Sequence, residues 1–529
     1  MNPHLPSTRL LRNQRGILTV GIFLLCATAS TLFAQTRLAG IFSSDMVVQR
    51  ERPVAVWGWD APGTTVTVTA ADQSISTEVE ADSAWQVSLS PLPTGGPYTI
   101  VVTGSSTIRL DNVLSGEVWL CSGQSNMEFR LDRSEGGPEA IEHSADGLLR
   151  LCTIPRSLAE EPRKDGVAHW AQAGPRSSFR FSAVAYWFGR ILRDSLNIPV
   201  GLVHSSWGGT AAESWIPRSV LESHPLFRPI LDRWEDGMRT FPEQHAAFLR
   251  RKPELDMQWQ KDSASNAALH RAPPARPQAP RGPGSRDTPT GQWNAMIHPW
   301  LRFGIRGVIW YQGEANASRA TQYRELFPAL IGAWRAGWNN PTMPFYFVQL
   351  PNLRRGSDPL KEGWPALRDA QRATLSVPQT GMAVTIDVGD PLDLHPRNKR
   401  PVGERLARWT LSQTYGRDQI VASGPLSAGY RFDRGRIVIG FTHLGGGLRP
   451  RNADGLTGFL IAAEDRIFRP ARARIEGDSV VIWHPGVPDP VAVRYAWAED
   501  PDWSLMNAAQ LPASPFRTDA WHEVTFGPP

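Results

Sequence analysis

The stretch Gly116-Glu-Val-Trp-Leu-Cys-Ser-Gly-Gln-Ser-Asn-Met-Glu-Phe129 decides the fold of this 529-residue chain. Residues 116–121 alternate apolar and polar side chains and include Val and Trp, which is typical of a β-strand. The small polar residues that follow end a strand and cap a helix. Ser125 lies in this cluster, where unpaired backbone amides and the helix dipole favour negative charge, so it is well placed as a nucleophile. A simple helix cap is the ordinary alternative for such a serine.

Strands and helices alternate through the middle of the chain. Apolar runs predict further strands at 148–154, 199–206, 304–311, 344–350 and 382–387. Helical spacing of apolar residues predicts helices at 181–195, 320–337, 364–375 and 400–413. This α/β alternation is typical of a parallel sheet with helices on both faces, whose ligand crevice lies at the carboxyl ends of the strands. Polar clusters follow four strands and are expected to meet there: Ser125, Gly208-Gly209, Gln312-Gly-Glu314 and Asp393-Leu-His395.

Three of these residues supply the groups that acyl transfer by a serine needs. Ser125 is the expected nucleophile, and His395 is the base that takes its proton and later returns it to the leaving alcohol. A carboxylate holds the histidine tautomer and stabilises the imidazolium. Asp393 lies two residues before His395 and is the first choice for this carboxylate, with Asp390 and Glu314 as alternatives.

The oxyanion of the tetrahedral intermediate needs hydrogen-bond donors, and three are predicted. Ser125 offers its backbone amide, Gly209 has no side chain to block its amide, and Gln312 offers a carboxamide. The ordinary alternatives are a tight turn at 208–209 and a buried polar network around Gln312 and Glu314. Four clusters at four strand ends nevertheless favour a serine hydrolase. Residues 123–127 lack the second glycine of the α/β-hydrolase elbow, which disfavours that fold.

Two β-rich regions flank the α/β part. Short alternating runs with turn residues predict a small N-terminal β-sandwich at 37–113 and a C-terminal β region at 423–529. The catalytic domain is expected at 114–422. An insertion at about 217–292 interrupts it, helical around 242–251 and then rich in Pro and Arg at 271–286. That composition predicts a mobile, solvated loop.

Residues 1–34 have the basic start, apolar core and small residues of a secretory signal peptide, so a secreted or periplasmic protein is expected. The apolar run is short for a membrane span, and Leu25 before Cys26 is unlike a lipoprotein signal, so no membrane anchor is expected. The three arginines of this segment account for part of the formal charge of +5, and without them 5 − 3 = +2 remains. This near-neutral balance gives no reason to expect nucleic acid as a partner.

Cys121 and Cys152 remain after removal of this segment. Each closes a predicted strand, and neighbouring strands would bring the two thiols within disulfide range in an oxidising compartment. Two buried free thiols are the alternative. The sequence contains no spacing typical of a metal site or a phosphate loop, so neither a metal nor a cofactor is expected.

The motifs around the candidate site resemble the sialate O-acetylesterase family, a branch of the SGNH hydrolases. The resemblance covers about residues 38–519 and rests on Gly116–Met127, Ser206–Thr210, Gly307–Asn316 and Asp393–Pro396. It implies a flavodoxin-like, three-layer αβα domain and metal-free removal of acetyl groups from sugar hydroxyls. It also implies Ser125, His395 and Asp393 as catalytic residues, with Ser125, Gly209 and Gln312 forming the oxyanion hole. Gln312 departs from the asparagine that most SGNH hydrolases place in this block.

The residues beside the catalytic ones are expected to contact substrate: Gln124, Asn126, Trp207, Glu314 and Asn316. The expected partner is an acetylated carbohydrate, either a sialic acid or a plant polysaccharide such as acetylated xylan. A sialic acid carboxylate would need an arginine, and Arg130 and Arg397 are near the motifs in the sequence. A non-catalytic carbohydrate-binding protein and an esterase for non-sugar esters are the alternative functions.

Overall fold

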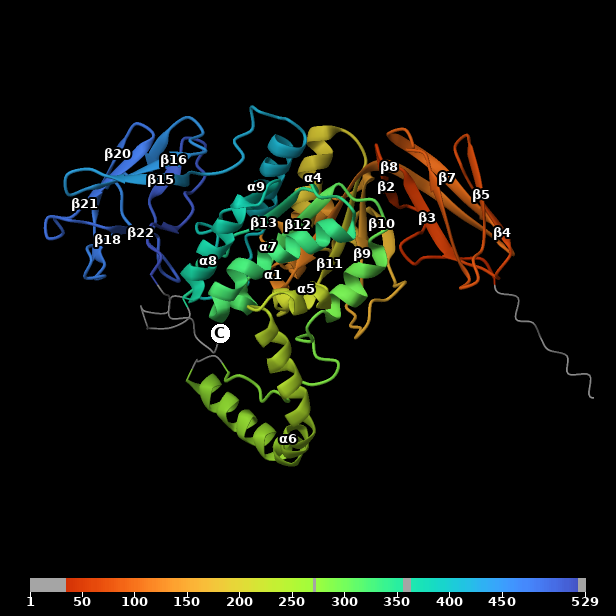
Figure 1. Cartoon of the computed structure of the whole chain (residues 1–529), viewed down its shortest axis with the longest axis horizontal. Coiled ribbons are helices and arrows are strands. Elements are labelled where there is room, and N and C mark those ends of the chain that lie inside the picture. The colour runs from red at the N-terminus through yellow and green to blue at the C-terminus, as the bar shows by residue number, and fades with distance from the viewer. Residues whose placement is uncertain (1–34, 270–272, 355–362, 522–529) are drawn as a thin grey trace, which may run out of the picture.

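The computed structural model describes residues 35–269, 273–354 and 363–521 of the chain. The expected signal peptide, residues 1–34, lies outside this part. Figure 1 shows an α/β body in the middle, a β-rich part at either end and helix α6 projecting from the body. Within the described residues, no helix combines the length and apolar character that a membrane crossing needs.

One sheet runs through the body in the order β10-β9-β11-β8-β12-β13-β14. The strands are β8 (Thr107–Gly123), β9 (Asp146–Thr153), β10 (His169–Ala173), β11 (Val200–Ser206), β12 (Gly307–Tyr311), β13 (Phe345–Val348) and β14 (Thr380–Ala383). Neighbours from β9 to β14 are parallel, and β10 is antiparallel to β9. β11, β12 and β13 are buried at every residue, as expected for parallel strands covered on both faces.

Helices cover the two faces of this sheet. Side chains alternate between faces along a strand, so Phe345 and Phe347 of β13 point away from the side that Tyr346 occupies. The two phenylalanines pack on Phe327 of α7 (Ala320–Gly337), with ring centroids 6.0 and 5.0 Å apart. On the other face, Trp119 of β8 stacks on Tyr346 and meets a ring of α4 (Ala183–Leu196). Helix α8 (Gly363–Ala373) packs on α7, and α9 (Arg400–Trp409) packs on α4.

Strand β8 joins the N-terminal part to the body. Its first half pairs antiparallel with β7 (Gly95–Thr103) and runs beside β2 (Val47–Gln49), and its second half lies between β11 and β12. The sequence predicted this strand only from residue 116, because the first half is partly exposed and less apolar. One strand therefore runs through the boundary expected between residues 113 and 114.

The N-terminal part contains two sheets. One sheet is formed by β1 (Arg37–Leu38), β3 (Val54–Trp59) and β6 (Ala84–Leu89). The other contains β4 (Thr65–Ala70), β5 (Gln73–Glu78) and β7, and continues into β8. Strand β4 alternates buried and less buried residues, so its apolar side chains form one buried face.

The insertion contains α5 (Arg218–Ser223), the long helix α6 (Arg228–Ala268) and a return segment. The prediction of a helix only around 242–251 was too short, since Pro242 and Pro253 would ordinarily end a helix. Helix α6 instead continues across both prolines and bends on its way out of the body and back (Figure 1). The Pro/Arg-rich return segment packs closely, because a Cβ at Gly282 would lie 2.1 Å from the Phe241 ring of α6.

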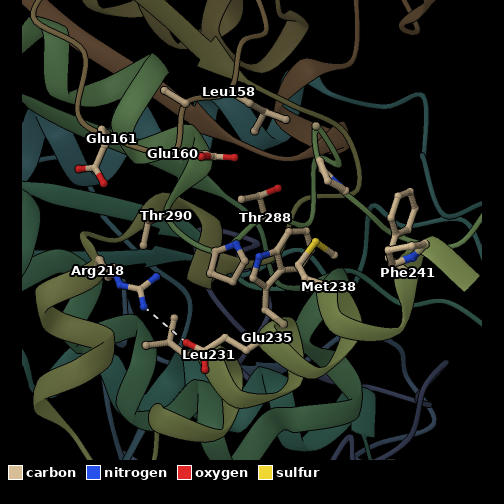
Figure 2. A pocket seen from close by; sticks show the side chains of 16 residues that line it. Leu158, Glu160, Glu161, Arg218, Leu231, Glu235, Met238, Phe241, Thr288 and Thr290 are labelled. Atoms are coloured by element: carbon tan, nitrogen blue, oxygen red, sulfur yellow. Dashed lines mark ion pairs between the residues drawn. The ribbon is translucent and has the colours of Figure 1, made fainter.

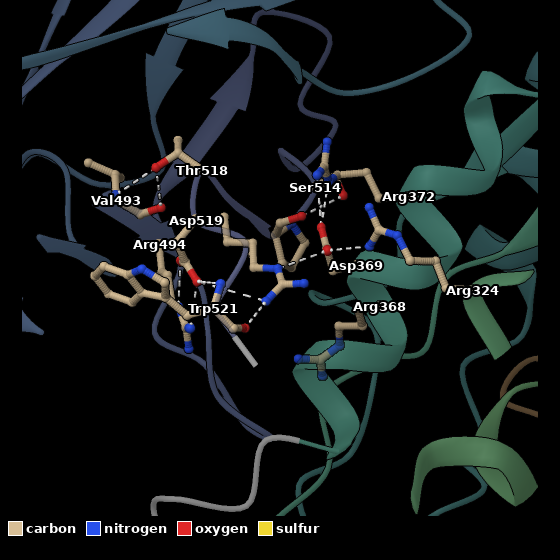
Figure 3. Close-up of polar contacts among 12 residues, drawn as sticks. Arg324, Arg368, Asp369, Arg372, Val493, Arg494, Ser514, Thr518, Asp519 and Trp521 are labelled. Carbon is tan, nitrogen blue, oxygen red and sulfur yellow. Dashed lines mark hydrogen bonds and ion pairs between the residues drawn. The ribbon is translucent and has the colours of Figure 1, made fainter. Parts of the chain in front are cut away.

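The C-terminal part is attached to α8 through buried charges (Figure 3). Its strands are β15 (Leu426–Phe432), β16 (Ile437–Thr442), β17 (Leu448–Pro450), β18 (Phe459–Ala462), β19 (Arg469–Pro470), β20 (Arg472–Glu476), β21 (Ser479–Trp483), β22 (Ala492–Tyr495), β23 (Leu505–Asn507) and β24 (Phe516–Arg517). Asp369 of α8 pairs with Arg517 of β24 at 3.2 Å, and with Arg324 and Arg372 at 2.9 and 2.8 Å. Burial alone would raise the pKa of Asp369, but the arginines hold it below its usual value. The carboxylate therefore stays charged and fixes β24 against the body.

The disulfide considered for Cys121 and Cys152 does not form. Both thiols are free and buried, on β8 and β9 respectively. The expectation that these strands are neighbours was wrong because β11 lies between them, with His204 opposite Cys121 and Val203 opposite Cys152. Two strand spacings separate the thiols by roughly 10 Å, beyond the reach of a disulfide.

Candidate active site

Ser125 and His395 meet at the carboxyl end of the central strand. Ser125 is the first residue of the short helix α1 (Ser125–Glu128), two residues after β8 ends. His395 lies before α9, and its Nε2 is 2.9 Å from Ser125 Oγ. Gly123 makes this turn possible, because its φ is +140° and a Cβ there would lie 2.1 Å from the carbonyl oxygen of Tyr311. The structure thus brings together two groups that lie 270 residues apart in the chain.

Asp393 lies beside the imidazole, on the same loop. Its Oδ1 accepts a hydrogen bond from the backbone amide of His395 at 2.8 Å and lies 4.0 Å from Nδ1. Its side chain is 54% exposed, so solvent screens its charge. The two alternative carboxylates are bonded elsewhere: Asp390 accepts from the amide of Leu392, and Glu314 accepts from Asn126.

The glycine pair at 208–209 lies directly against the nucleophile. A Cβ at Gly208 would be 3.2 Å from Ser125 Cβ, so this turn forms one wall of the site. The amide of Gly208 donates to Glu128 Oε2 at 2.9 Å and is therefore occupied. Gly209 has a left-handed φ of +78°, and a Cβ there would be 2.8 Å from the guanidinium carbon of Arg286. A side chain at 209 would be strained and would collide with the return segment of the insertion.

Asn126 is the centre of a buried network that holds the histidine loop. Its Nδ2 donates to Glu314 Oε1 at 2.6 Å and to the carbonyl oxygen of Leu394 at 3.0 Å. Its Oδ1 accepts from Lys399 Nζ at 2.5 Å. Lys399 is fully buried, four residues after His395, and was missed in the sequence because a lysine is usually a surface residue.

Burial sets the protonation of this network. It lowers the pKa of Lys399 to about 7, although Glu314 and Asp393 oppose the shift. It raises the pKa of Glu314, against the hydrogen bond from Asn126. Burial followed by the charge of Lys399 lowers the pKa of His395, and Asp393 acts in the opposite direction. The imidazole is therefore neutral at neutral pH and able to accept a proton.

Gln312 and Asn316 are bonded to each other and to the neighbouring loops. Gln312 Nε2 donates to Asn316 Oδ1 at 2.7 Å and to the carbonyl oxygen of Thr210 at 3.3 Å. Asn316 Nδ2 in turn donates to Glu213 Oε2 at 2.7 Å. The carboxamide predicted to be an oxyanion donor is thus occupied in this geometry, as the alternative of a buried polar network anticipated.

Four of the five expected substrate contacts are buried. Gln124, Asn126, Glu314 and Asn316 are between 0 and 8% exposed. Gln124 Oε1 accepts from the amide of Ala315 at 3.3 Å, so it joins the nucleophile turn to the end of β12. The fifth, Trp207, is half-buried and lines an open hollow beside the glycine pair.

A pocket of about 460 Å³ opens over Ser125 and His395. Its walls carry four arginines and one carboxylate, Arg130, Arg133, Arg156, Arg180 and Glu128. Arg156 pairs with Glu128 and Arg130 with Asp132, each at 2.5 Å. Arg133 and Arg180 are exposed and have no ion pair among the described residues. The pocket is therefore cationic, and two of its charges are free to meet an anion.

Of the two arginines named from the sequence, only one lines this pocket. Arg130 lines it as anticipated, whereas Arg397 instead donates through Nε to the carbonyl oxygen of Arg133 at 3.0 Å. Arg133, Arg156 and Arg180 were missed, because they lie in connecting segments without a motif.

Comparison with known proteins gives concordant findings. The family described as "Carbohydrate esterase, sialic acid-specific acetylesterase" matches residues 291–412. Sialate O-acetylesterase of Rattus norvegicus is 34% identical over 431 residues, which cover 74% of this chain and 76% of that protein. The Homo sapiens protein of the same name is 32% identical over 431 residues, covering 74% and 73%. The crystal structure of a carbohydrate acetylesterase from Xanthomonas citri has a TM-score of 0.79 and 35% identity, covering 92% of this chain and 100% of that chain.

Proposed function

The chain belongs to the sialate O-acetylesterase family and is a carbohydrate O-acetylesterase, and from this premise we propose that it cleaves acetyl esters of sugar hydroxyls through an acyl-enzyme on Ser125. The observation that carries the mechanism is the 2.9 Å contact between Ser125 Oγ and His395 Nε2 under an open pocket. Family membership favours this function over the two alternatives, a non-catalytic binding protein and an esterase for non-sugar esters.

In the proposed reaction His395 moves one proton in each half. Ser125 Oγ attacks the acetyl carbonyl carbon while His395 Nε2 takes its proton. The tetrahedral intermediate then breaks the bond to the sugar oxygen, which receives that proton. A water molecule, deprotonated by His395, then attacks the acetyl carbon on Ser125. The bond from that carbon to Ser125 Oγ breaks, Oγ regains the proton from His395, and acetic acid leaves and ionises to acetate. The lowered pKa of His395 supports this role, since the base has to be neutral when the substrate arrives.

We assign Asp393 as the carboxylate that orients His395. It shares a loop with His395, and its bond to the His395 amide fixes the two residues relative to each other. The 4.0 Å gap to Nδ1 is longer than a hydrogen bond, and such contacts often shorten when substrate binds.

We assign the backbone amides of Ser125 and Gly209 as the oxyanion donors. Ser125 is the first residue of α1, where backbone amides have no partner inside the helix. Gly209 has the bare backbone that a close approach requires. Gln312, which the family resemblance also includes, is proposed to act by fixing Thr210 and Asn316 behind this turn.

We propose an acetylated sugar acid, such as a sialic acid, as the substrate in preference to neutral xylan. Arginine pairs with carboxylates through two parallel hydrogen bonds, and Arg133 and Arg180 are free for such a contact. The cationic pocket beside Ser125 supports this choice, because an uncharged polysaccharide would leave these charges without a counter-ion.

The test is the variant Ser125→Ala, assayed for acetate release from O-acetylated sialic acid and from p-nitrophenyl acetate. Both activities are expected to fall to background with the fold retained, as judged by circular dichroism. Ser122→Ala is the matched control, since Ser122 lies three residues earlier in β8 and its buried hydroxyl makes no hydrogen bond in the described structure. Full activity of Ser125→Ala would refute the nucleophile. Faster release from acetylated xylan than from the sialic acid would refute the substrate.

We further propose the domain assignment that accompanies this function. The body, 114–422, is an SGNH-type domain of flavodoxin-like αβα form, supported by the order β11-β8-β12-β13-β14, which is 2-1-3-4-5 along the chain when β9 is set aside. We propose residues 37–113 as a β-sandwich module that shares strand β8 with the body, and residues 423–529 as a C-terminal β region, of which the structure describes the part up to Trp521. Residues 1–34 are proposed to direct export, which would bring the enzyme to extracellular or periplasmic glycans.

A further inference from the structure

A second pocket, of about 660 Å³, lies between the body and the insertion (Figure 2). Residues 158–161 form its body side, and α6 with the return segment forms the other. The insertion contributes an apolar surface from Trp234, Met238 and Phe241. Polar groups surround this surface, with Glu160, Glu161, Glu235, Arg218, Thr288 and Thr290 among the lining residues.

The second pocket adjoins the catalytic one through a shared segment. Thr153, Ile154, Pro155 and Arg156 line the catalytic pocket, and the same segment lines the second pocket from Leu158 onward. Arg156 and Leu158 are two residues apart, so their Cα atoms are separated by at most about 7 Å. The hollow at Trp207 shares Phe241 and Pro283 with the second pocket. The two pockets are therefore adjacent along residues 153–161.

The two pockets have opposite charge. Four arginines line the catalytic pocket, whereas three carboxylates and one arginine line the second. Glu235 is paired with Arg218 at 3.5 Å, and Glu160 and Glu161 are exposed without an ion pair among the described residues. The second pocket therefore repels a sugar acid, and its carboxylates are free to accept hydrogen bonds from hydroxyl groups.

We propose that the second pocket binds an uncharged sugar of the same glycan, next to the acetylated sugar acid held at Ser125. An aromatic floor with a few polar groups around it is the composition of a small-molecule site, and Trp234 offers its ring to the apolar face of a pyranose. Phe241 is stacked on His245, with ring centroids 4.9 Å apart, and forms the wall beside Trp234. Glu160 and Glu161 accept bonds from its hydroxyls. The inference rests on the proposed function, because it takes the acidic sugar to occupy the arginine-lined pocket.

The experiment compares two substrates on the full chain: free O-acetylated sialic acid, and the same acetylated sugar linked to lactose. We expect the linked substrate to have the higher kcat/KM, by about three- to tenfold, the range that one aromatic contact contributes. Trp234→Ala is expected to bring this ratio to about one, and to leave hydrolysis of p-nitrophenyl acetate unchanged. Glu160→Ala combined with Glu161→Ala is the second variant, which is expected to lower the ratio without disturbing the apolar surface.

Leu249→Ala is the matched control, because Leu249 is an exposed apolar residue on α6 that does not line the pocket. If the wild-type kcat/KM values for the linked and free substrates were equal, or if their ratio were unchanged in both pocket variants, the inference would be overturned. The proposed chemistry would still stand in that case as long as p-nitrophenyl acetate is hydrolysed. Acetate release from neither sialic substrate would refute the proposed function instead. Saturation-transfer NMR of lactose with the Ser125→Ala chain would then decide on the pocket, since loss of the signal in Trp234→Ala supports it and absence of any signal refutes it.

Discussion

Replacing Lys399 by methionine tests whether a buried cation sets the protonation of the catalytic base. Methionine keeps most of the apolar stem but removes the 2.5 Å bond to Asn126 Oδ1, and so leaves a buried acceptor without its donor. Such a loss costs about 1–3 kcal/mol of the free energy of unfolding. The pKa of Lys399 is about 7, so the amine is charged at the acidic pH values at which His395 titrates. Removing this like charge stabilises the imidazolium, which is expected to raise the pKa of His395.

The assay is kcat/KM for p-nitrophenyl acetate measured from acidic to neutral pH. A higher pKa keeps His395 protonated to higher pH, so the acidic limb of the profile is expected to move upward in pH. Asp393 and Glu314 face Lys399 from the histidine loop and from the end of β12. Loss of the ammonium also raises the pKa of Glu314 further, but the charges that shift the pKa of His395 are those of Lys399 and Asp393. Arg400→Met is the matched control, since Arg400 is the next residue, 61% exposed and paired with Glu404. An acidic limb that stays in place in Lys399→Met, or that moves in the control, would contradict the reasoning.

Two further substitutions probe the remaining groups of the site. Asp393→Asn is expected to lower kcat by about 10- to 100-fold with KM little changed, because the exposed carboxylate lies 4.0 Å from Nδ1; a loss near 10⁴-fold would show a direct bond during turnover instead. Arg133→Ala and Arg180→Ala are each expected to raise KM for O-acetylated sialic acid by about tenfold, the loss of one charge-assisted contact, without changing p-nitrophenyl acetate hydrolysis. A KM that stays constant in both arginine variants would place the sugar carboxylate elsewhere.

Periodicity predicted the elements of the body because most of them are strongly patterned. The range expected for α7, 320–337, is the observed one, since its apolar residues recur on one face along the whole helix. The long helix α6 was mostly missed for the opposite reason. Its sequence is polar and contains Pro242 and Pro253, and few of its residues are buried. It therefore lacks the apolar stripe from which a helix can be predicted.

Sequence order was a weaker guide to neighbours in the sheet. Cys121 and Cys152 lie in strands that are consecutive in the patterned body, but β11 enters between them. The sequence of neither strand shows that β11 lies between them, because buried strands of a parallel sheet all have apolar side chains on both faces. The convergence of Ser125 and His395 was predictable on different grounds, since the carboxyl ends of parallel strands share one edge whatever their order.

The chemistry at that edge depends on side-chain directions that the sequence does not fix. In a strand the alternation of faces tells which residues are buried, but past its end the chain turns and the alternation is lost. Gln124, Asn126, Glu314 and Asn316 all lie past strand ends, and their side chains bond within the buried network rather than line the pocket. Their bonds nevertheless serve the reaction, because Asn126 ties the carbonyl oxygen of Leu394 to α1 and thereby holds His395 at Ser125. The buried amine of Lys399 donates to Asn126 Oδ1 and so satisfies the acceptor of this side chain. Asn126 therefore links the buried polar network to the loop that carries His395.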